Sequence, residues 1–431
     1  MFGNMIGVGI FLYPSLIANR LSHPIYFFLF WILGGIIAIS GALSSAVLAM
    51  DKPEVGGDYA YLRNAYGNKI SFVYGFIAMV ITFPGSIAIG LSLTLHIQGA
   101  TLFGSFVNEP LGFFYMYQFL GIGIILFLFI INYFGIHSSL FFQRFFTLIP
   151  LIFLILTFLW IIFYSIFVQS SAPFFLLSNF SLPFGKLDFL NTGTALVAIY
   201  WTYTGWNAPL SLGNEIENAE KVLPRAMILG PIFVMLLYIF FCLIFVSFLP
   251  YTILQEESTD IFHSILQMSF GDTYTSKILS LCIFLIIIGN INSAMITGSR
   301  ILLAMSEDKL MFANLKKLNR YSAPVNSLFA LTLFSSLLIL FLEKQSKILN
   351  LSFICLCLLS ILTILSVYKL KKKINLLFRL MPIVYSVSTL FILGLILYEY
   401  FEKKEYGIPI LSVSVFIIAF LIAKLQERNK K

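Results

Sequence analysis

Long apolar segments recur throughout this chain of 431 residues. A helix needs about 20 mostly apolar residues to cross the hydrocarbon core of a bilayer, and twelve segments meet that requirement. Only 11% of the residues are charged, against roughly 25% in soluble domains, which excludes a soluble enzyme, a nucleic-acid-binding protein and a disordered chain. The sequence therefore predicts an all-α, polytopic membrane protein with 12 transmembrane helices. The predicted spans are 2–18, 24–50, 70–97, 115–134, 145–168, 190–212, 227–249, 277–304, 325–342, 348–368, 380–400 and 407–423.

The basic residues of the connections predict the orientation of these spans. Cytoplasmic loops of membrane proteins carry an excess of Lys and Arg. Most of the 27 Lys and Arg residues lie in connections on the same side as the N-terminus, and the tail 424–431 belongs to this group. We therefore predict an integral, multi-pass protein of the cytoplasmic (inner) membrane with both its N- and C-termini in the cytoplasm.

Glycine and proline interrupt two of the predicted spans. The first span contains Gly7 and Gly9, followed by Pro14, and the sixth contains Gly205, followed by Pro209. In a helix interior Gly costs about 1 kcal/mol and Pro about 3 kcal/mol relative to Ala, so both spans are predicted to break there. Glycine in a membrane helix also serves close packing, but two such motifs five spans apart favour broken helices 1 and 6.

The spacing of the breaks predicts the domain organisation and the kind of ligand. Broken first and sixth helices are typical of two inverted five-helix halves, here about 1–168 and 190–368, which form a ten-helix core over 1–368. Two additional spans and a short basic tail make up 369–431. Amides at a half-helix N-terminus attract anions, and carbonyls at a C-terminus attract cations. Facing breaks therefore predict a site for a free amino acid, which carries both charges.

Several motifs resemble one superfamily of transporters. Residues 3–11, 53–67, 298–308 and 323–326 resemble the amino acid–polyamine–organocation (APC) superfamily, and 84–88 and 203–226 resemble its L-type (LAT-like) branch. The resemblance covers residues 1 to about 370. It implies the leucine-transporter fold, with ten core helices in inverted halves plus two more, and the activity of a permease for amino acids.

The resemblance also implies how the substrate is bound. Its carboxylate would contact main-chain amides of the first break, and its ammonium would contact main-chain carbonyls of the sixth span. Trp201 occupies the position of an aromatic residue that closes over the substrate, and Ser86 that of a polar residue in span three. The substrate-binding residues implied in this way are Ile6, Gly7, Val8, Gly9, Ser86, Trp201, Thr204 and Gly205.

Three features of the spans bear on coupling to an ion. Part of the family carries in span five a Lys that replaces a sodium ion, but 146–151 contains no Lys, so that route is not expected. The family's polar position in span ten has no counterpart in 353–359, which is almost wholly apolar. In span eight, Asn290, Ser293 and Thr297 share one helical face, where they would support an ion or the substrate, or form bonds between helices.

The charge pattern within the spans predicts the substrate class. No Asp, Glu, Lys or Arg lies deep inside a predicted span, and an intramembrane charge would mark a proton relay or a counter-ion. Small or apolar zwitterionic L-amino acids are therefore the predicted substrates of a secondary active transporter, coupled to a proton or to a counter-substrate. The predicted partners are this substrate and the lipid bilayer, with no nucleic acid, metal or cofactor.

One alternative stays open and another is excluded. A membrane sensor of the same fold would bind an amino acid without moving it. Only five residues precede Ile6, which we expect to reflect either a truncated start or a short first half-helix, and a short half-helix favours the sensor. An enzyme would need a nucleophile–base pair or a metal cluster at membrane depth. The spans contain no such grouping, so we do not predict catalysis.

Overall fold

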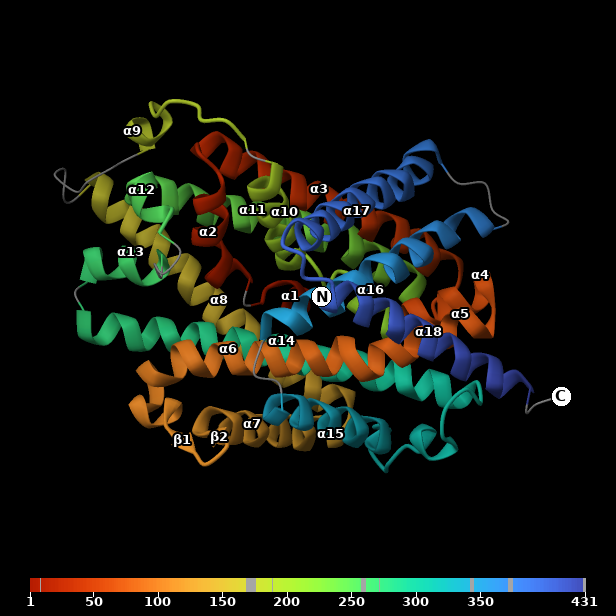
Figure 1. The fold of residues 1–431 in the computed structure, drawn as a ribbon. Coiled ribbons are helices and arrows are strands. Elements are labelled where there is room, and N and C mark those ends of the chain that lie inside the picture. Colours follow the sequence, from red (N-terminus) through yellow and green to blue (C-terminus); the bar gives the residue numbers. More distant parts are fainter. Residues whose placement is uncertain are drawn as a thin grey trace.

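Helices make up almost the whole fold (Figure 1). The computed structural model describes residues 1–7, 9–167, 176–187, 189–256, 261–270, 272–341, 345–370 and 375–428. These ranges confirm the predicted all-α class, and their one hairpin is β1 (Pro110–Leu111) paired antiparallel with β2 (Phe114–Tyr115). The α-helices are α1 (Phe2–Met5), α2 (Gly9–Arg20), α3 (Pro24–Asp51), α4 (Asp58–Tyr66), α5 (Asn68–Ile77), α6 (Phe83–Phe103), α7 (Met116–Tyr133), α8 (Ile136–Phe167), α9 (Leu176–Phe180), α10 (Phe189–Thr202), α11 (Ala219–Phe248), α12 (Tyr251–Leu254), α13 (Ile261–Phe270), α14 (Asp272–Glu307), α15 (Val325–Phe341), α16 (Gln345–Leu365), α17 (Leu376–Glu402) and α18 (Gly407–Arg428). The π-helical segment is η1 (Ala78–Thr82), and the 3-10 turns are η2 (Ser105–Asn108), η3 (Ala208–Ser211), η4 (Gly213–Glu215), η5 (Ala313–Lys316) and η6 (Ser366–Lys369).

Within the described ranges, nine helices are long and apolar enough to cross a membrane. They correspond to nine of the twelve predicted spans. The first, sixth and ninth predicted spans correspond instead to α1 with α2, to α10, and to α15, which is apolar but has 17 residues. Large apolar side chains of the long helices are exposed, among them Ile130, Leu156 and Leu236. An extended apolar exterior of this kind is expected where a protein contacts lipid.

The helices form two groups on either side of a central pair (Figure 1). In the pair, α6 packs along α14, and α7 and α15 cover one side of it. On the other side α3 packs against α11 and α17, while α10 packs against α2. The N-terminus lies in the middle of the molecule, where α1 contacts α8, α11 and α14, and the C-terminus lies at its edge. The first break is therefore at the centre of the fold.

Both predicted interruptions are present. α1 ends at Met5 and α2 begins at Gly9, whereas α10 ends at Thr202 and is followed by a non-helical turn. After that turn, the predicted sixth span continues as the short 3-10 turns η3 and η4 and not as an α-helix. Pro209 lies in the first turn of η3, where its missing N–H needs no intrahelical partner.

Span three contains a π-helical segment between α5 and α6. Phe83 donates its N–H to the carbonyl of Ala78, five residues back. Pro84 follows directly and has no N–H to donate, so the regular pattern of helical hydrogen bonds is disturbed at this point. Single π-helical turns inside α-helices are frequent at functional sites.

Candidate functional site

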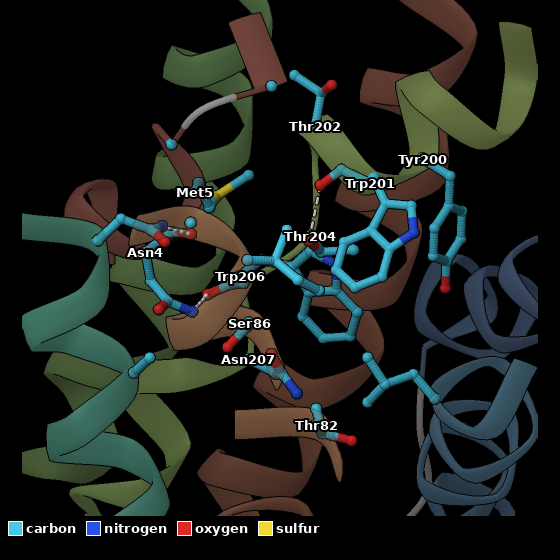
Figure 2. A pocket seen from close by; sticks show the side chains of 18 of the residues that line it. Asn4, Met5, Thr82, Ser86, Tyr200, Trp201, Thr202, Thr204, Trp206 and Asn207 are labelled. Carbon is cyan, nitrogen blue, oxygen red and sulfur yellow. Dashed lines mark hydrogen bonds between the residues drawn. The ribbon is translucent and has the colours of Figure 1, made fainter. Parts of the chain in front are cut away.

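A cavity of about 200 Å³ lies between the two breaks. Its wall takes residues from the first and sixth spans, from both sides of the π-helical segment in span three, and from α14, α16 and α17. None of the described lining residues has a charged side chain. Figure 2 shows Asn4 and Met5 on one side of this space and Trp201 with Tyr200 on the other. A charged ligand would therefore meet backbone dipoles, amides, hydroxyls and aromatic rings.

The interrupted spans touch at their broken ends. A Cβ atom at Gly9 would lie 2.9 Å from the Cα of Thr202 and 2.5 Å from its hydroxyl oxygen, so only glycine allows this approach. α2 begins here and α10 ends here. The first amides of a helix carry partial positive charge, and the last carbonyls carry partial negative charge. The cavity thus presents opposite partial charges next to each other, as a zwitterion requires.

The turn after α10 depends on Gly205. Its φ is +99°, in the region that residues with a Cβ avoid, and a Cβ there would lie 2.5 Å from the carbonyl oxygen of Asn4. Asn4 donates from Nδ2 to the carbonyl of Gly205 at 3.1 Å, and Asn290 donates from Nδ2 to the carbonyl of Asn4 at 2.8 Å. These bonds connect α1, the second break and α14.

Tyr238 of α11 bonds to both breaks, and sequence reasoning missed it. Its hydroxyl lies 3.0 Å from the carbonyl oxygen of Met5 and 3.2 Å from that of Thr202, and it donates its proton to this pair. The side chain is fully buried. The last carbonyls of a helix have no intrahelical partner, so Tyr238 serves one at the end of α1 and one at the end of α10. A tyrosine in an apolar span has no local signature that would reveal this role.

The carbonyls of the second break differ in how many bonds they already accept. Trp201 accepts bonds from the N–H of Thr204 at 3.1 Å and from its hydroxyl at 2.7 Å. Gly205 accepts bonds from Asn4 and from the N–H of Ala208 at 3.3 Å. A carbonyl oxygen has two lone pairs, so both are fully used. The Thr204 carbonyl accepts no bond from the part of the chain that the structure describes and is the best placed of the three to receive an ammonium.

The predicted site residues divide into those that line the cavity and those that do not. Ile6 is fully buried and is not part of the described wall, and Val8 lies outside the described residues. Ser293 and Thr297, predicted on one face with Asn290, also lie away from the wall. The predicted residues that line the cavity are Gly7, Gly9, Ser86, Trp201, Thr204, Gly205 and Asn290.

Thr82 of span three is, after Tyr238, a second residue of the site that the sequence did not reveal. The hydroxyl of Ser86 donates to the carbonyl of Phe83 at 2.9 Å, so its proton is used within the helix. Thr82, the last residue of the π-helical segment, also lines the cavity, and its buried hydroxyl has no hydrogen-bond partner. The indole Nε1 of Trp201 is another buried polar atom without a partner in this wall. Because such groups are rare in folded proteins, Thr82 joins the candidate ligand-binding residues.

The eleventh span also reaches the cavity. Tyr385 of α17 lines it, with its hydroxyl 2.6 Å from that of Tyr200 and 3.0 Å from the hydroxyl of Ser360, to which it donates. Ser360 lies on α16, one residue beyond the apolar stretch 353–359. The cavity thus draws on a span that was predicted to lie outside the ten-helix core.

Residues 53–58 pack against residues 207–213, next to the cavity-lining residues Asn207 and Tyr74, both of which bond to Asp58. The N–H of Gly56 donates to the carbonyl of Ser211 at 3.3 Å, and Val55 pairs with Leu212 in an isolated β-bridge. We call this packing the loop contact. It joins the connection after span two to the second half of the sixth span.

Ion pairs surround the loop contact. Arg300 of α14 is buried and donates to both carboxylate oxygens of Glu215, at 2.9 and 3.0 Å. Arg63 of α4 donates to Asp308 and, at 2.6 Å, to Glu54. A bidentate arginine–carboxylate pair fixes geometry as well as charge. Arg300 and Arg63 are thus held by acidic partners, and neither lines the cavity.

The fold and the cavity define a class of protein, a multi-pass integral membrane protein whose interrupted helices enclose an uncharged central cavity. A family model described as amino acid permease matches residues 1–424. The chain belongs to this family, within the APC superfamily to which its motifs point.

Individual relatives have names that agree with this family. The chain is 28% identical to the serine/threonine exchanger SteT of Bacillus subtilis (strain 168), over 91% of this chain and 88% of that protein. It is 26% identical to the human large neutral amino acids transporter small subunit 2, over 91% of this chain and 72% of the relative. It is 26% identical to the mouse b(0,+)-type amino acid transporter 1, over 70% of this chain but only 59% of that protein. These relatives are named as transporters and an exchanger, which confirms that the family is one of permeases and not of enzymes.

Proposed function

We propose that this protein is a secondary active transporter that moves small or apolar zwitterionic L-amino acids across the cytoplasmic membrane by alternating access. The observation that carries the proposal is the uncharged cavity between oppositely polarised helix ends, where Gly9 of α2 meets Thr202 of α10. A strongly charged substrate side chain would find no counter-charge among the described lining residues. The names of the relatives, which refer to serine/threonine and to large neutral amino acids, support a neutral substrate.

The substrate would use both breaks at once. Its carboxylate would accept bonds from amides of the first break, at Gly7 and at the start of α2, because the first amides of a helix have no intrahelical partner. Its ammonium would donate to the Thr204 carbonyl, which accepts no bond from the described chain. Trp201 would cover the substrate from the side that Figure 2 shows opposite Asn4. Asn290 would hold the first break through its bond to Asn4.

The loop contact would be the cytoplasmic gate of this cycle. We place both termini in the cytoplasm, since the connections on that side hold most of the Lys and Arg residues. Residues 53–58 of the loop contact belong to one of these connections, the one after span two. Two inverted halves, about 1–168 and 190–368, would let the broken helices move against the scaffold. Opening would separate residues 53–58 from 207–213 and expose the cavity to the cytoplasm.

Uptake by the purified, reconstituted protein tests the proposal. Liposomes are loaded with an unlabelled amino acid or left empty, and entry of each labelled amino acid is followed. We expect entry of neutral amino acids that exceeds entry into protein-free liposomes. Faster entry into loaded liposomes would identify exchange, and entry driven by an imposed pH gradient would identify proton coupling. Binding with no flux under all three conditions would identify a sensor and contradict the proposal.

A stability measurement selects the amino acids for that assay. A ligand that binds only the folded state raises its apparent stability, so the melting temperature is compared with each of the twenty amino acids. We expect the largest increases from small or apolar neutral amino acids. An increase confined to Lys, Arg, Asp or Glu would contradict the predicted substrate class.

A further inference from the structure

Asp58 is a buried acidic residue next to the cavity, and the binding roles above do not use it. It is the first residue of α4 and is 5% exposed. One carboxylate oxygen, Oδ2, accepts bonds from Asn207 Nδ2 at 2.5 Å and from the hydroxyl of Tyr74 at 3.3 Å. Both donors line the cavity, Asn207 from the second break and Tyr74 from α5. A single carboxyl oxygen thus holds two wall residues that come from separate elements.

Among the residues that the structure describes, no positive charge forms an ion pair with this carboxyl. Within the described ranges, the cations near it are engaged elsewhere: Arg63 pairs with Asp308 and Glu54, Lys52 also pairs with Glu54, and Arg300 pairs with Glu215. Asp58 forms no ion pair with any described residue. Burying an unpaired carboxylate is costly, so the presence of an acidic side chain at this place needs an explanation.

Among the described residues, the titratable groups that act on Asp58 or on the nearby Tyr61 are phenols and acids. Tyr74 of α5 donates a hydrogen bond to Asp58. On α4, burial raises the pKa of the Tyr61 phenol, and the charges of Asp58, Glu54 and Asp51 raise it further. Burial raises the pKa of Asp58 itself to about 6, although the bonds from Asn207 and Tyr74 act in the opposite direction. The carboxyl therefore changes its charge close to the pH of the cytoplasm, whereas the phenols stay neutral there.

We propose that Asp58 is a positioning residue of the transport cycle, which holds Asn207 and Tyr74 in place and carries a proton while the cytoplasmic gate is closed. The proposal rests on the proposed function for the meaning of the gate. When residues 53–58 separate from 207–213, Asp58 gains water and gives up its proton to the cytoplasm. The proton is bound and released at the carboxyl oxygen, with no other bond formed or broken.

The direction of the pH dependence follows from linkage. Asp58 has a pKa of about 6 while the gate is closed. Once the gate opens and water reaches the carboxyl, its pKa is expected to return to near the ordinary 3.8. The state with the higher pKa is favoured at low pH. The ratio of closed to open molecules is then expected to rise by about ten-fold between pH 7 and pH 5. Raising the pH through 6 opens the gate.

Two readouts test this role. In the first, spin labels on cysteines introduced at the exposed positions Asn68 and Glu220 report the distance across the gate. Labelling is directed to these two positions because the four native cysteines are buried. In the second, reconstituted protein releases a labelled amino acid toward the cytoplasmic face at different pH values. Wild type is expected to shift toward the short distance, and to slow its release by up to about ten-fold, between pH 7 and pH 5. D58N is expected to lose both responses because its amide does not titrate in this range.

Two further variants keep the test decisive if D58N folds poorly. Tyr74→Phe removes a bond that lowers the pKa of Asp58, so the midpoint of the pH response should move to higher pH. Glu427→Gln removes an exposed carboxyl that pairs with Lys69 on α5, and it should respond like wild type. A pH response in D58N equal to that of wild type, or a midpoint unmoved in Y74F, would overturn the role of Asp58.

The distance readout separates this proposal from the proposed function. If wild type transports no amino acid but its gate distance still shifts with pH and D58N does not, the transporter proposal fails and the role of Asp58 stands. If wild type transports amino acids and neither readout depends on Asp58, the role of Asp58 fails and the transporter proposal stands.

Discussion

At the residue scale, the breaks exist because glycine occupies two positions that no other residue fits. Gly9 lets α2 approach the backbone of Thr202, and Gly205 adopts a φ of +99° against the backbone of Asn4. Each is required for a different reason, one for close packing and one for backbone conformation. The proposed binding by main-chain groups therefore depends on the absence of a side chain at both positions.

Replacing Gly205 by alanine tests this dependence. The Cβ would meet the Asn4 carbonyl at 2.5 Å in a strained backbone conformation, which costs about 1–3 kcal/mol. We expect Gly205→Ala to lower the melting temperature and abolish the increase caused by a bound amino acid. Gly123→Ala on α7, where a Cβ would meet open space, serves as the control: it should raise the melting temperature slightly, because alanine favours a helix interior over glycine, and it should keep the increase caused by a bound amino acid. An amino acid affinity in Gly205→Ala equal to that of wild type would contradict the assignment.

Tyr238 yields a second prediction at this scale. Tyr238→Phe removes the hydroxyl that serves the carbonyls of Met5 and Thr202, and leaving buried acceptors unpaired costs about 1–3 kcal/mol. We expect lower stability and weaker amino acid binding. Tyr251→Phe is a control of similar burial: Tyr251 donates to the Leu21 carbonyl near the far end of α2, and that carbonyl keeps its second bond, from Gln255. It should lose stability but keep its affinity. If Tyr238→Phe binds an amino acid as tightly as Tyr251→Phe does, Tyr238 does not support the binding site.

At the scale of elements, the π-helical segment of span three brings Thr82 to the cavity. The segment precedes Pro84, and its last residue presents a buried hydroxyl without a partner. An unpaired hydroxyl weakens a fold, so its presence in the wall of a site favours a role toward a ligand.

Thr82→Val tests that role because valine has nearly the same shape and no hydroxyl. We expect unchanged or higher stability and a KM for amino acid uptake that rises several-fold, by the loss of one hydrogen bond of roughly 1 kcal/mol. Thr332→Val on α15 removes another buried, unpartnered hydroxyl, away from the cavity. It should have a similar effect on stability and none on KM. If both variants keep the wild-type KM, Thr82 does not contact the substrate.

The pair between Arg300 and Glu215 connects α14 to the second half of the sixth span. The Arg300 side chain is 3% exposed, whereas that of Glu215 is 27% exposed. Removing one partner of a buried pair leaves an uncompensated charge, at a cost of about 3–5 kcal/mol. Glu215→Gln should therefore destabilise the protein more than Arg300→Gln, and the double variant should recover part of the loss. Additive losses in thermal unfolding would show that the two residues are not coupled.

At the scale of the whole molecule, local signals predicted the spans and the breaks but not the contacts between distant segments. Runs of apolar residues and the glycines at 7, 9 and 205 act within a few residues, so the sequence reveals them directly. Tyr238 lies 233 residues from Met5, and Tyr385 lies 185 residues from Tyr200. Their roles arise only when the chain folds, because a tyrosine in an apolar helix has the same sequence context whether it faces lipid, core or cavity.

Asp58 shows a further reason why sequence reasoning was incomplete. It lies in a connection and not in a predicted span, so a search for charges within the spans passes over it. The packing of residues 53–58 against 207–213 then buries it beside Asn207 at the end of the cavity. A residue that the sequence pattern places outside the spans can therefore be buried in the folded protein.

Altered ligands test whether main-chain groups at the two breaks bind both charges of an amino acid. A transported L-amino acid is compared with its decarboxylated amine and with its N-acetyl derivative as competitors of labelled uptake. The two-break site predicts that each analogue loses affinity by roughly 10- to 100-fold, because each leaves one set of backbone groups without its charged partner. Competition by the decarboxylated amine as strong as that of the amino acid itself would contradict it.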